Sequence, residues 1–176
     1  MSKEETIISC IESLVWSESW YTVSPYHRQY GEETEFYELE DYLLENYLGI
    51  FASKIVMIIL KLICLYTAYI EITGVYKKNH TVLLGIEEDT DIRDKGLKKI
   101  EQIIKGVIME EGMGNVNVYF SEFDSLISIG CQFSVSVHTD EPEFLLSVRE
   151  LVKMEGLSIW MVEDGGKPTY HFDEIG

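Results

Sequence analysis

An apolar segment, LGIFASKIVMIILKLICLYTAYI at residues 48–70, restricts the possible folds more than any other part of the chain. It is long enough to cross a bilayer, which takes about 20 apolar residues. Lys54 and Lys61 interrupt it seven positions apart, so both lie on one face of a helix. Each ammonium group would cost about 2.5–3.5 kcal/mol at the centre of a bilayer on insertion scales. We therefore expect a mostly buried helix from about residue 50 to residue 66, with a narrow polar edge, and no membrane span.

The chain after this segment carries strand and helix patterns in alternation. AYIEITGVYKKNHTVLLGI predicts two strands around a Lys-Lys-Asn-His turn, VNVYF one strand, and LISIGCQFSVSVH one long strand with a bulge at Gly130. One helix is predicted to start in EEDTDIRDKG and a second has Pro142 in its first turn and Gly156 at its end. LSIWMV and PTYHF, joined by EDGGK, predict a final hairpin.

From residue 81 these elements follow the ferredoxin-like order β-α-β-β-α-β, extended by a final strand. Before them, SKEE opens a capped helix over residues 3–16, and the aperiodic residues 17–31 predict a loop. We expect one α+β domain over residues 1–176, with a helical part (1–66) and a mainly antiparallel sheet part (67–176). Its helices should cover one face of the sheet, with the N-terminal helices beside or over it.

The segment GEETEFYELEDYLLENY, residues 31–47, holds seven carboxylates and three tyrosines but no lysine or arginine. Its apolar and acidic residues fall on two separate helical stripes, Phe36, Leu39, Leu43 and Tyr47 on the first, and Glu35, Glu38, Asp41 and Glu45 on the second. This spacing predicts an amphipathic helix with an anionic outer face.

The whole chain is acidic, with 14 Lys and Arg against 31 Asp and Glu, a formal charge of −17. Nucleic-acid binding rests on clusters of basic residues, so this balance disfavours a nucleic-acid partner and an anionic lipid surface. A cationic protein partner fits better, although acidic chains are also common among cytosolic proteins. Five cations gather on one predicted helix, where we expect a solvated face: Arg93, Lys95, Lys98, Lys99 and Lys105.

A search for catalytic patterns gives only weak candidates. Glu122 and Asp124 stand two apart in the turn SEFDS, where solvent normally keeps such carboxylates from acid–base roles. The four histidines, His27, His80, His138 and His171, are scattered along the chain, and DTDIRDKG lacks the glycine and glutamate of an EF-hand. Cys10, Cys64 and Cys131 are predicted to be buried, reduced thiols. We expect no enzymatic activity, no cofactor and no metal site.

In size, charge and architecture, and in acidic stretches such as EETEFYELEDYLLE and EFD, the chain resembles the immunity proteins of bacterial polymorphic toxins, including those of contact-dependent growth inhibition systems. The resemblance implies a cytoplasmic protein that binds and blocks a cognate toxin domain, usually a nuclease, and needs no catalytic residues. It also implies that a sheet edge, in the 67–86 hairpin or the 168–172 strand, can accept a toxin strand. The acidic N-terminus, MSKEETIISCIES, lacks the basic and apolar pattern of a signal peptide, so we expect a cytoplasmic location.

The surface predicted to bind the partner consists of the acidic helix, the residues before it and the SEFDS turn: Glu32, Glu33, Glu35, Tyr37, Glu38, Asp41, Glu45, Glu122 and Asp124. The alternative function is a small-molecule-binding regulatory module, because ferredoxin-like order supports many such domains. Salt separates the two, since an electrostatic interface weakens as ionic strength rises. The sequence leaves the oligomeric state open.

Overall fold

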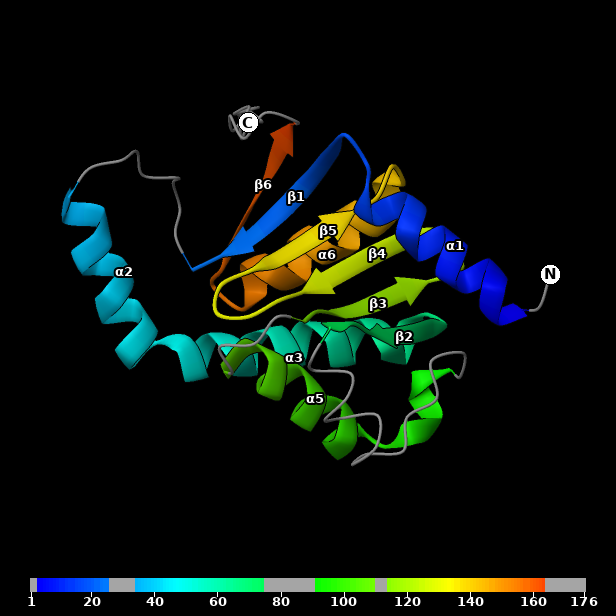
Figure 1. Ribbon diagram of the computed structural model, residues 1–176, viewed down its shortest axis with the longest axis horizontal. Helices are drawn as coiled ribbons and strands as arrows, with labels where there is room; N and C mark the ends of the chain where they lie inside the picture. Colours follow the sequence, from blue (N-terminus) through cyan, green and yellow to red (C-terminus); the bar gives the residue numbers. More distant parts are fainter. Residues whose placement is uncertain (1–2, 26–33, 75–90, 110–113, 164–176) are drawn as a thin grey trace.

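The computed structural model describes residues 3–25, 34–74, 91–109 and 114–163, and it confirms the α+β class. Figure 1 shows one twisted sheet with helices against it. Every neighbouring pair of strands in the sheet is antiparallel. The order of its six strands is β2 (Ala68–Ile72), β3 (Val116–Phe120), β4 (Ser125–Ile129), β5 (Val135–His138), β1 (Ser19–Ser24), β6 (Ser158–Glu163).

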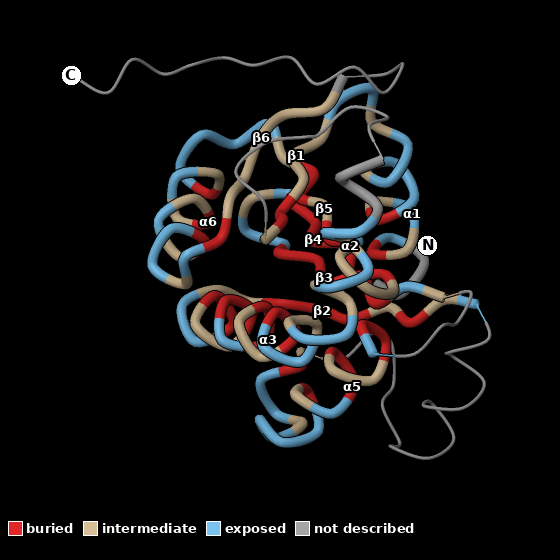
Figure 2. Tube along the Cα trace, turned by 90° about the vertical axis from the view of Figure 1, so that its left-hand side faces the viewer, coloured by how far each residue is buried: buried red, intermediate tan, exposed pale blue. Residues whose placement is uncertain are grey.

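One face of the sheet, the core face, is apolar along all of its strands. The helices α3 (Leu48–Leu65), α5 (Leu97–Met109) and α6 (Pro142–Met154) pack against it (Figure 2). The predicted stripe of α5 is confirmed, because Ile100, Ile103, Ile104, Val107 and Ile108 are all buried. The helix α1 (Lys3–Val15) lies on the other face, where Ile7 and Ile11 pack against Tyr69, Tyr119 and Leu126.

The apolar segment forms α3, which has the length and composition of a membrane span. Eight of its residues are buried in the core of this fold: Phe51, Ala52, Ile55, Val56, Ile58, Ile59, Leu62 and Ile63. Both lysines on its polar edge contact Glu155 at the C-terminal end of α6. Lys54 donates to the Glu155 carbonyl, and Lys61 Nζ lies 2.7 Å from Glu155 Oε1. Cations are favourable at the negative end of a helix dipole, so the two lysines join α3 to α6.

The prediction of a loop over residues 17–31 was wrong for its first part, because Ser19–Ser24 form β1, between β5 and β6. Val23 is buried and Tyr21 packs against the core, so one side of this short strand is anchored. Cross-strand pairing on both sides therefore outweighs its weak local signal.

The long strand predicted around Gly130 is instead a hairpin of β4 and β5. Gly130 N–H donates to the Ser134 carbonyl at 2.7 Å, and Gln132 has a φ of 56° in the turn between them. Phe133 packs edge-to-face on Phe51 with ring centroids 5.1 Å apart, which fixes the turn on the core. Two described strands, β4 and β5, therefore stand where one was expected.

The start of the helix predicted from EEDTDIRDKG was also placed too early. Asp91 caps a short 3₁₀ helix, η1 (Ile92–Lys95), by accepting from Arg93 N–H, and α5 begins only after Gly96. Gly96 has a φ of 84°, which separates the two helices.

Several predicted elements lie outside the described residues. They are the strand near 81–86, the strand at 168–172 and Ser2 of the capping box. Between α5 and α6 the described chain has three strands, β3, β4 and β5, where the ferredoxin-like order has two, so that order is not shown.

Candidate functional site

The acidic segment forms the helix α2 (Thr34–Asn46), as predicted, but α2 does not cover the sheet. Figure 1 shows it extending to one side of the molecule, and among the described elements its substantial contact is with α3. None of residues 38–46 is buried. The expectation that the N-terminal helices pack beside or over the sheet is confirmed for α1 and α3 and wrong for α2.

The exposed surface of α2 is both acidic and apolar. Glu38, Asp41 and Glu45 are all exposed, and they share one side of the helix. Tyr42 stands among them and is 62% exposed, while Leu39 on the neighbouring apolar stripe is 37% exposed. The sequence-based site omitted Tyr42, although its position four residues after Glu38 already placed it on the acidic side.

The structure describes the other predicted residues of this segment only in part. Glu35 and Tyr37 belong to the helical backbone of α2, and Glu32 and Glu33 lie outside the described residues.

The acidic side of α2 has no counter-charge within the helix. No lysine or arginine occurs between Arg28 and Lys54. Glu38 and Asp41 are three residues apart and Asp41 and Glu45 four apart, so like charges face each other at the two spacings that bring helical side chains together. Glu45 also lies in the last turn, where the helix dipole disfavours an anion. The helix is therefore electrostatically strained in isolation and suited to a cationic partner.

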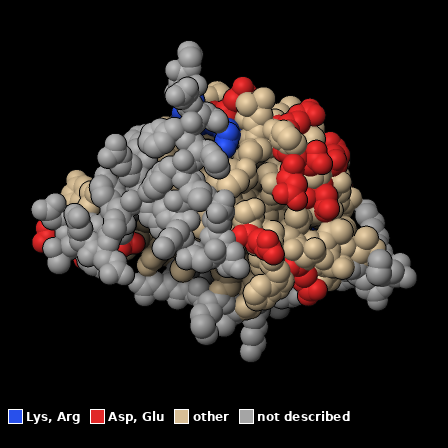
Figure 3. All heavy atoms as spheres, turned by 90° about the horizontal axis from the view of Figure 1, so that it is seen from above, with Lys and Arg blue, Asp and Glu red and all other residues tan. Residues whose placement is uncertain are grey.

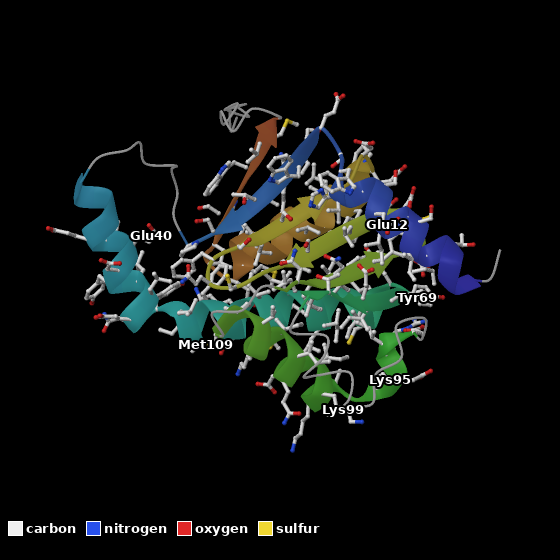
Figure 4. All side chains as sticks on the ribbon, in the orientation of Figure 1. Glu12, Glu40, Tyr69, Lys95, Lys99 and Met109 are labelled. Carbon is white, nitrogen blue, oxygen red and sulfur yellow. The ribbon has the colours of Figure 1, made fainter. Side chains whose placement is uncertain are left out.

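Lysines of η1 and α5 lie away from α2 or are paired within their own helix. Figure 4 shows Lys95 and Lys99 at the far end of the molecule from Glu40 on α2. Lys105 pairs with Glu101 at 2.7 Å, within α5. Viewed from above, acidic side chains appear at the α2 end and over a wider area at the opposite end, and a small basic patch lies near the top of the view (Figure 3).

Glu122 does not join the α2 surface. Its turn follows β3, at the α1 end of the sheet, whereas α2 extends from the other end (Figure 1). Glu122 Oε1 accepts from Thr67 N–H at 3.0 Å, and Arg93 Nη2 donates to Thr67 Oγ1 at 3.2 Å. The backbone hydrogen bond from Thr67, with Arg93 nearby, lowers the pKa of Glu122. The Glu122 carboxylate thus fixes the start of β2 against the β3–β4 turn.

Asp124, in the same turn, also has a partner within the fold. It adopts a φ of 45°, and its Oδ1 accepts from the Tyr119 hydroxyl at 2.9 Å. Burial, together with hydrogen bonds to Cys10 and Asp124, raises the pKa of Tyr119. Tyr119 therefore stays protonated and donates to Asp124 throughout the neutral pH range.

His138 is buried at the end of β5, and its hydrogen-bond partners differ from those of Glu122 and Asp124. Its Nδ1 lies 3.1 Å from Ser17 Oγ and its Nε2 lies 2.9 Å from Ser136 Oγ. Burial lowers the pKa of His138. Glu122, Asp124 and His138 each have a separate set of partners, so the structure does not assemble them into one acid–base group.

The cysteines differ from the expectation of three buried thiols, because Cys64 is exposed and Cys10 and Cys131 are half-buried. All three are free. Within the described part of the chain, no three His, Cys, Asp or Glu side chains are grouped to hold a metal ion.

The sheet edges were predicted as alternative docking positions. Among the described strands, β2 and β6 are the outermost. The outer side of β2 already forms a bridge, between Tyr69 and Asp91. The partner strands expected in the two terminal hairpins fall outside the described residues.

Comparison of the chain with models of protein families, with curated proteins and with solved structures gives no match.

Proposed function

We propose that this chain is a cytoplasmic immunity protein that binds and neutralises a cationic toxin domain, of the nuclease class, through α2. The observation that carries the proposal is the exposed acidic surface of α2. It extends from the body of the protein, presents Glu38, Asp41 and Glu45 together with Tyr42, and has no cation of its own.

Such a surface suits an inhibitor in three respects. Complementary electrostatic potentials raise the rate of association with a basic protein by about 10- to 1000-fold at low salt. An exposed tyrosine among charges is a typical anchor of an interface. The apolar stripe that includes Leu39 offers contact area beside the charges, so the complex would not depend on ion pairs alone.

The mechanism requires no catalytic residue. A row of carboxylates on a helix presents anionic groups to the basic groove with which a nuclease binds phosphates. Occupation of this groove by α2 would exclude the nucleic acid. The proposal therefore assigns inhibition to steric and electrostatic exclusion.

The test is a protection assay. The tagged chain captures basic proteins from the cells that produce it, and each captured domain is then expressed alone and together with the chain. Co-expression should restore growth, and the triple variant Glu38→Lys, Asp41→Lys, Glu45→Lys should fail to restore it.

A matched control changes three exposed glutamates outside α2, Glu12→Lys, Glu18→Lys and Glu150→Lys, and alters the net charge by the same amount. This control should protect as the unmodified chain does. Equal protection by both triple variants would refute the assignment to α2, and absence of any toxic partner would refute the immunity function.

A further inference from the structure

Two helices that follow each other directly in the chain, α2 and α3, each carry an exposed apolar stripe. On α2, Leu39 is 37% exposed, and Leu43 lies four residues further along the same side and is half-buried. On α3, Ile50 is 51% exposed and Met57 is 45% exposed. Cys64, a further seven residues along, is also exposed. We call these lines the α2 stripe (Leu39, Leu43) and the α3 outer stripe (Ile50, Met57, Cys64).

The α3 outer stripe is a continuous feature of its helix. A spacing of seven residues is close to two helical turns, so its three members lie in one line. They point away from the eight residues that α3 buries in the core. Single exposed apolar residues are common on protein surfaces, whereas a contiguous apolar line marks an interaction surface.

The joint between the helices keeps α2 from covering the α3 outer stripe of its own chain. Only Tyr47 separates α2 from α3, whereas antiparallel helix pairs are joined by loops of about 2–5 residues. Tyr47 N–H donates to the Leu43 carbonyl at 2.8 Å, and the Tyr47 carbonyl accepts from Phe51 N–H at 2.9 Å. Lys54 Nζ lies 5.6 Å from the centre of the Tyr47 ring. Helical hydrogen bonds thus continue through the bend seen in Figure 1, and α2 cannot reverse onto α3.

The two helices are complementary in charge. The helix α2 contains no lysine or arginine, and α3 contains no aspartate or glutamate. Glu40 lies beside the α2 stripe, and Lys54 and Lys61 lie beside the α3 outer stripe. The hydrogen bond of Lys54 ends on a carbonyl oxygen, which carries no net charge, so its ammonium group can still attract a carboxylate. Apolar contact and charge therefore select the same occupant for the α3 outer stripe, an α2 helix.

We propose that two copies of this chain pair by exchanging α2, so that the α2 stripe of each copy packs on the α3 outer stripe of the other. Each stripe is then covered by the helix that the joint at Tyr47 keeps from it within one chain. Exchange of an identical element between copies is a low-cost route to a two-fold dimer, and a short joint favours it. Glu40 of one copy meets Lys54 of the other.

This pairing goes beyond the proposed function and uses a different side of α2. Glu38, Asp41 and Glu45 lie on the side of the helix opposite the α2 stripe, so they stay exposed in the dimer. A second copy and a cationic partner compete only for the apolar side around Leu39. The net charge of −17 opposes pairing at low salt, but at 150 mM NaCl the Debye length of about 8 Å screens most of this long-range repulsion.

The assay is sedimentation equilibrium of the full chain in 150 mM NaCl, from about 1 µM to about 1 mM protein. The mass should rise with concentration from 20.3 kDa to twice this value. Leu39→Lys on the α2 stripe and Met57→Glu on the α3 outer stripe each place a charge inside both contacts. Each variant should weaken pairing by at least about tenfold.

Both variants should keep their helices. The new lysine lies four residues after Glu35, and the new glutamate lies between Lys54 and Lys61, at spacings where opposite charges stabilise a helix. Trp16→Glu is the control, because Trp16 is 84% exposed and follows α1, on the other face of the sheet. This control should pair as the unmodified chain does.

A mixture of the two variants tests the exchange itself. In a mixed pair of Leu39→Lys and Met57→Glu, one contact carries neither substitution, and in the other contact the new charges attract each other. The mixture should therefore pair more tightly than either variant alone. A dimer built from α3 alone would not show this gain.

Four results would overturn the proposal. They are a mass of 20.3 kDa at every concentration, normal pairing by Leu39→Lys, a mixture that pairs no better than its components, and a monomeric chain that binds neutral phosphatidylcholine vesicles through Met57. The last result would assign the α3 outer stripe to a membrane surface. Because the assay uses the chain alone and leaves Glu38, Asp41 and Glu45 unchanged, its failure would leave the proposed immunity function untouched.

Discussion

Asp41→Lys should make α2 more stable while it weakens binding to a cationic partner. Asp41 lies between Glu38, three residues before it, and Glu45, four residues after it, and all three side chains are exposed. A like-charge pair at these spacings destabilises a helix by about 0.2–0.5 kcal/mol, and an opposite pair stabilises it by a similar amount. Reversal of the central charge converts two repulsive pairs into two attractive ones, for a gain of about 1 kcal/mol at low salt.

Amide hydrogen exchange is the suitable assay, because α2 contacts mainly α3 and its opening can be separate from global unfolding. A gain of about 1 kcal/mol corresponds to roughly fivefold slower exchange of the α2 amides. Asp41→Gln is the control, since it removes the repulsion without adding attraction and has a helix propensity close to that of lysine. It should give about half of the gain in free energy.

Salt separates this electrostatic effect from a difference in helix propensity. In 1 M NaCl the Debye length falls to about 3 Å, so Asp41→Lys and Asp41→Gln should become nearly equal. Equal exchange of the two variants at low salt would refute the reasoning that carboxylate repulsion strains α2. A lysine variant that exchanges faster than the unmodified chain would refute it as well.

Three further predictions concern the body of the fold. Ile11→Ala, at a position 1% exposed between α1 and the sheet, should lower the free energy of unfolding by about 2–4 kcal/mol in urea titrations; a loss below about 1 kcal/mol would show that α1 is not firmly docked. Burial holds the pKa of His138 below its ordinary 6.5, so the unfolded chain takes up this proton first as the pH falls. The contribution of His138 to stability should be complete above about pH 6.5 and decline below it, and His138→Gln should remove this part of the pH dependence; an unchanged slope between pH 7 and 5.5 would contradict the assignment. Lys61→Met should lower the free energy of unfolding by about 1 kcal/mol through loss of the partly buried pair with Glu155, and equal stability of the variant and the unmodified chain would show that this pair is neutral.

Helices in which the hydrophobic periodicity continues over many residues were predictable from the sequence. The stripes of α3 and α5 define helices whatever surrounds them, because only one face of each can enter a core. The strand β1 lacked such a signal. It has only six residues, and its place in the sheet depends on partners more than 100 residues away.

The hairpin of β4 and β5 could not be read from alternation alone. Ile127, Ile129, Phe133, Val135 and Val137 all contribute to the core, and all have odd numbers. The turn between the two strands keeps this parity, so the sequence alternates as if one strand continued through it.

The candidate site was predictable in part. The acidic side of α2 follows from helical spacing, but the direction in which α2 leaves the body does not, since an amphipathic pattern does not say what covers its apolar stripe. The structural role of the SEFDS turn was also not predictable, because it depends on tertiary hydrogen bonds. Glu122 accepts from Thr67 and Asp124 accepts from Tyr119.

The most direct test of the central claim is the salt dependence of binding between the chain and its captured basic partner, measured by titration calorimetry from 50 to 500 mM NaCl. The account predicts affinity that falls steeply with salt for the unmodified chain. For the variant Glu38→Lys, Asp41→Lys, Glu45→Lys it predicts weak binding with little salt dependence. Tight binding that is indifferent to salt, or unchanged by the three reversals, would contradict a role for α2 as the surface that recognises a cationic protein.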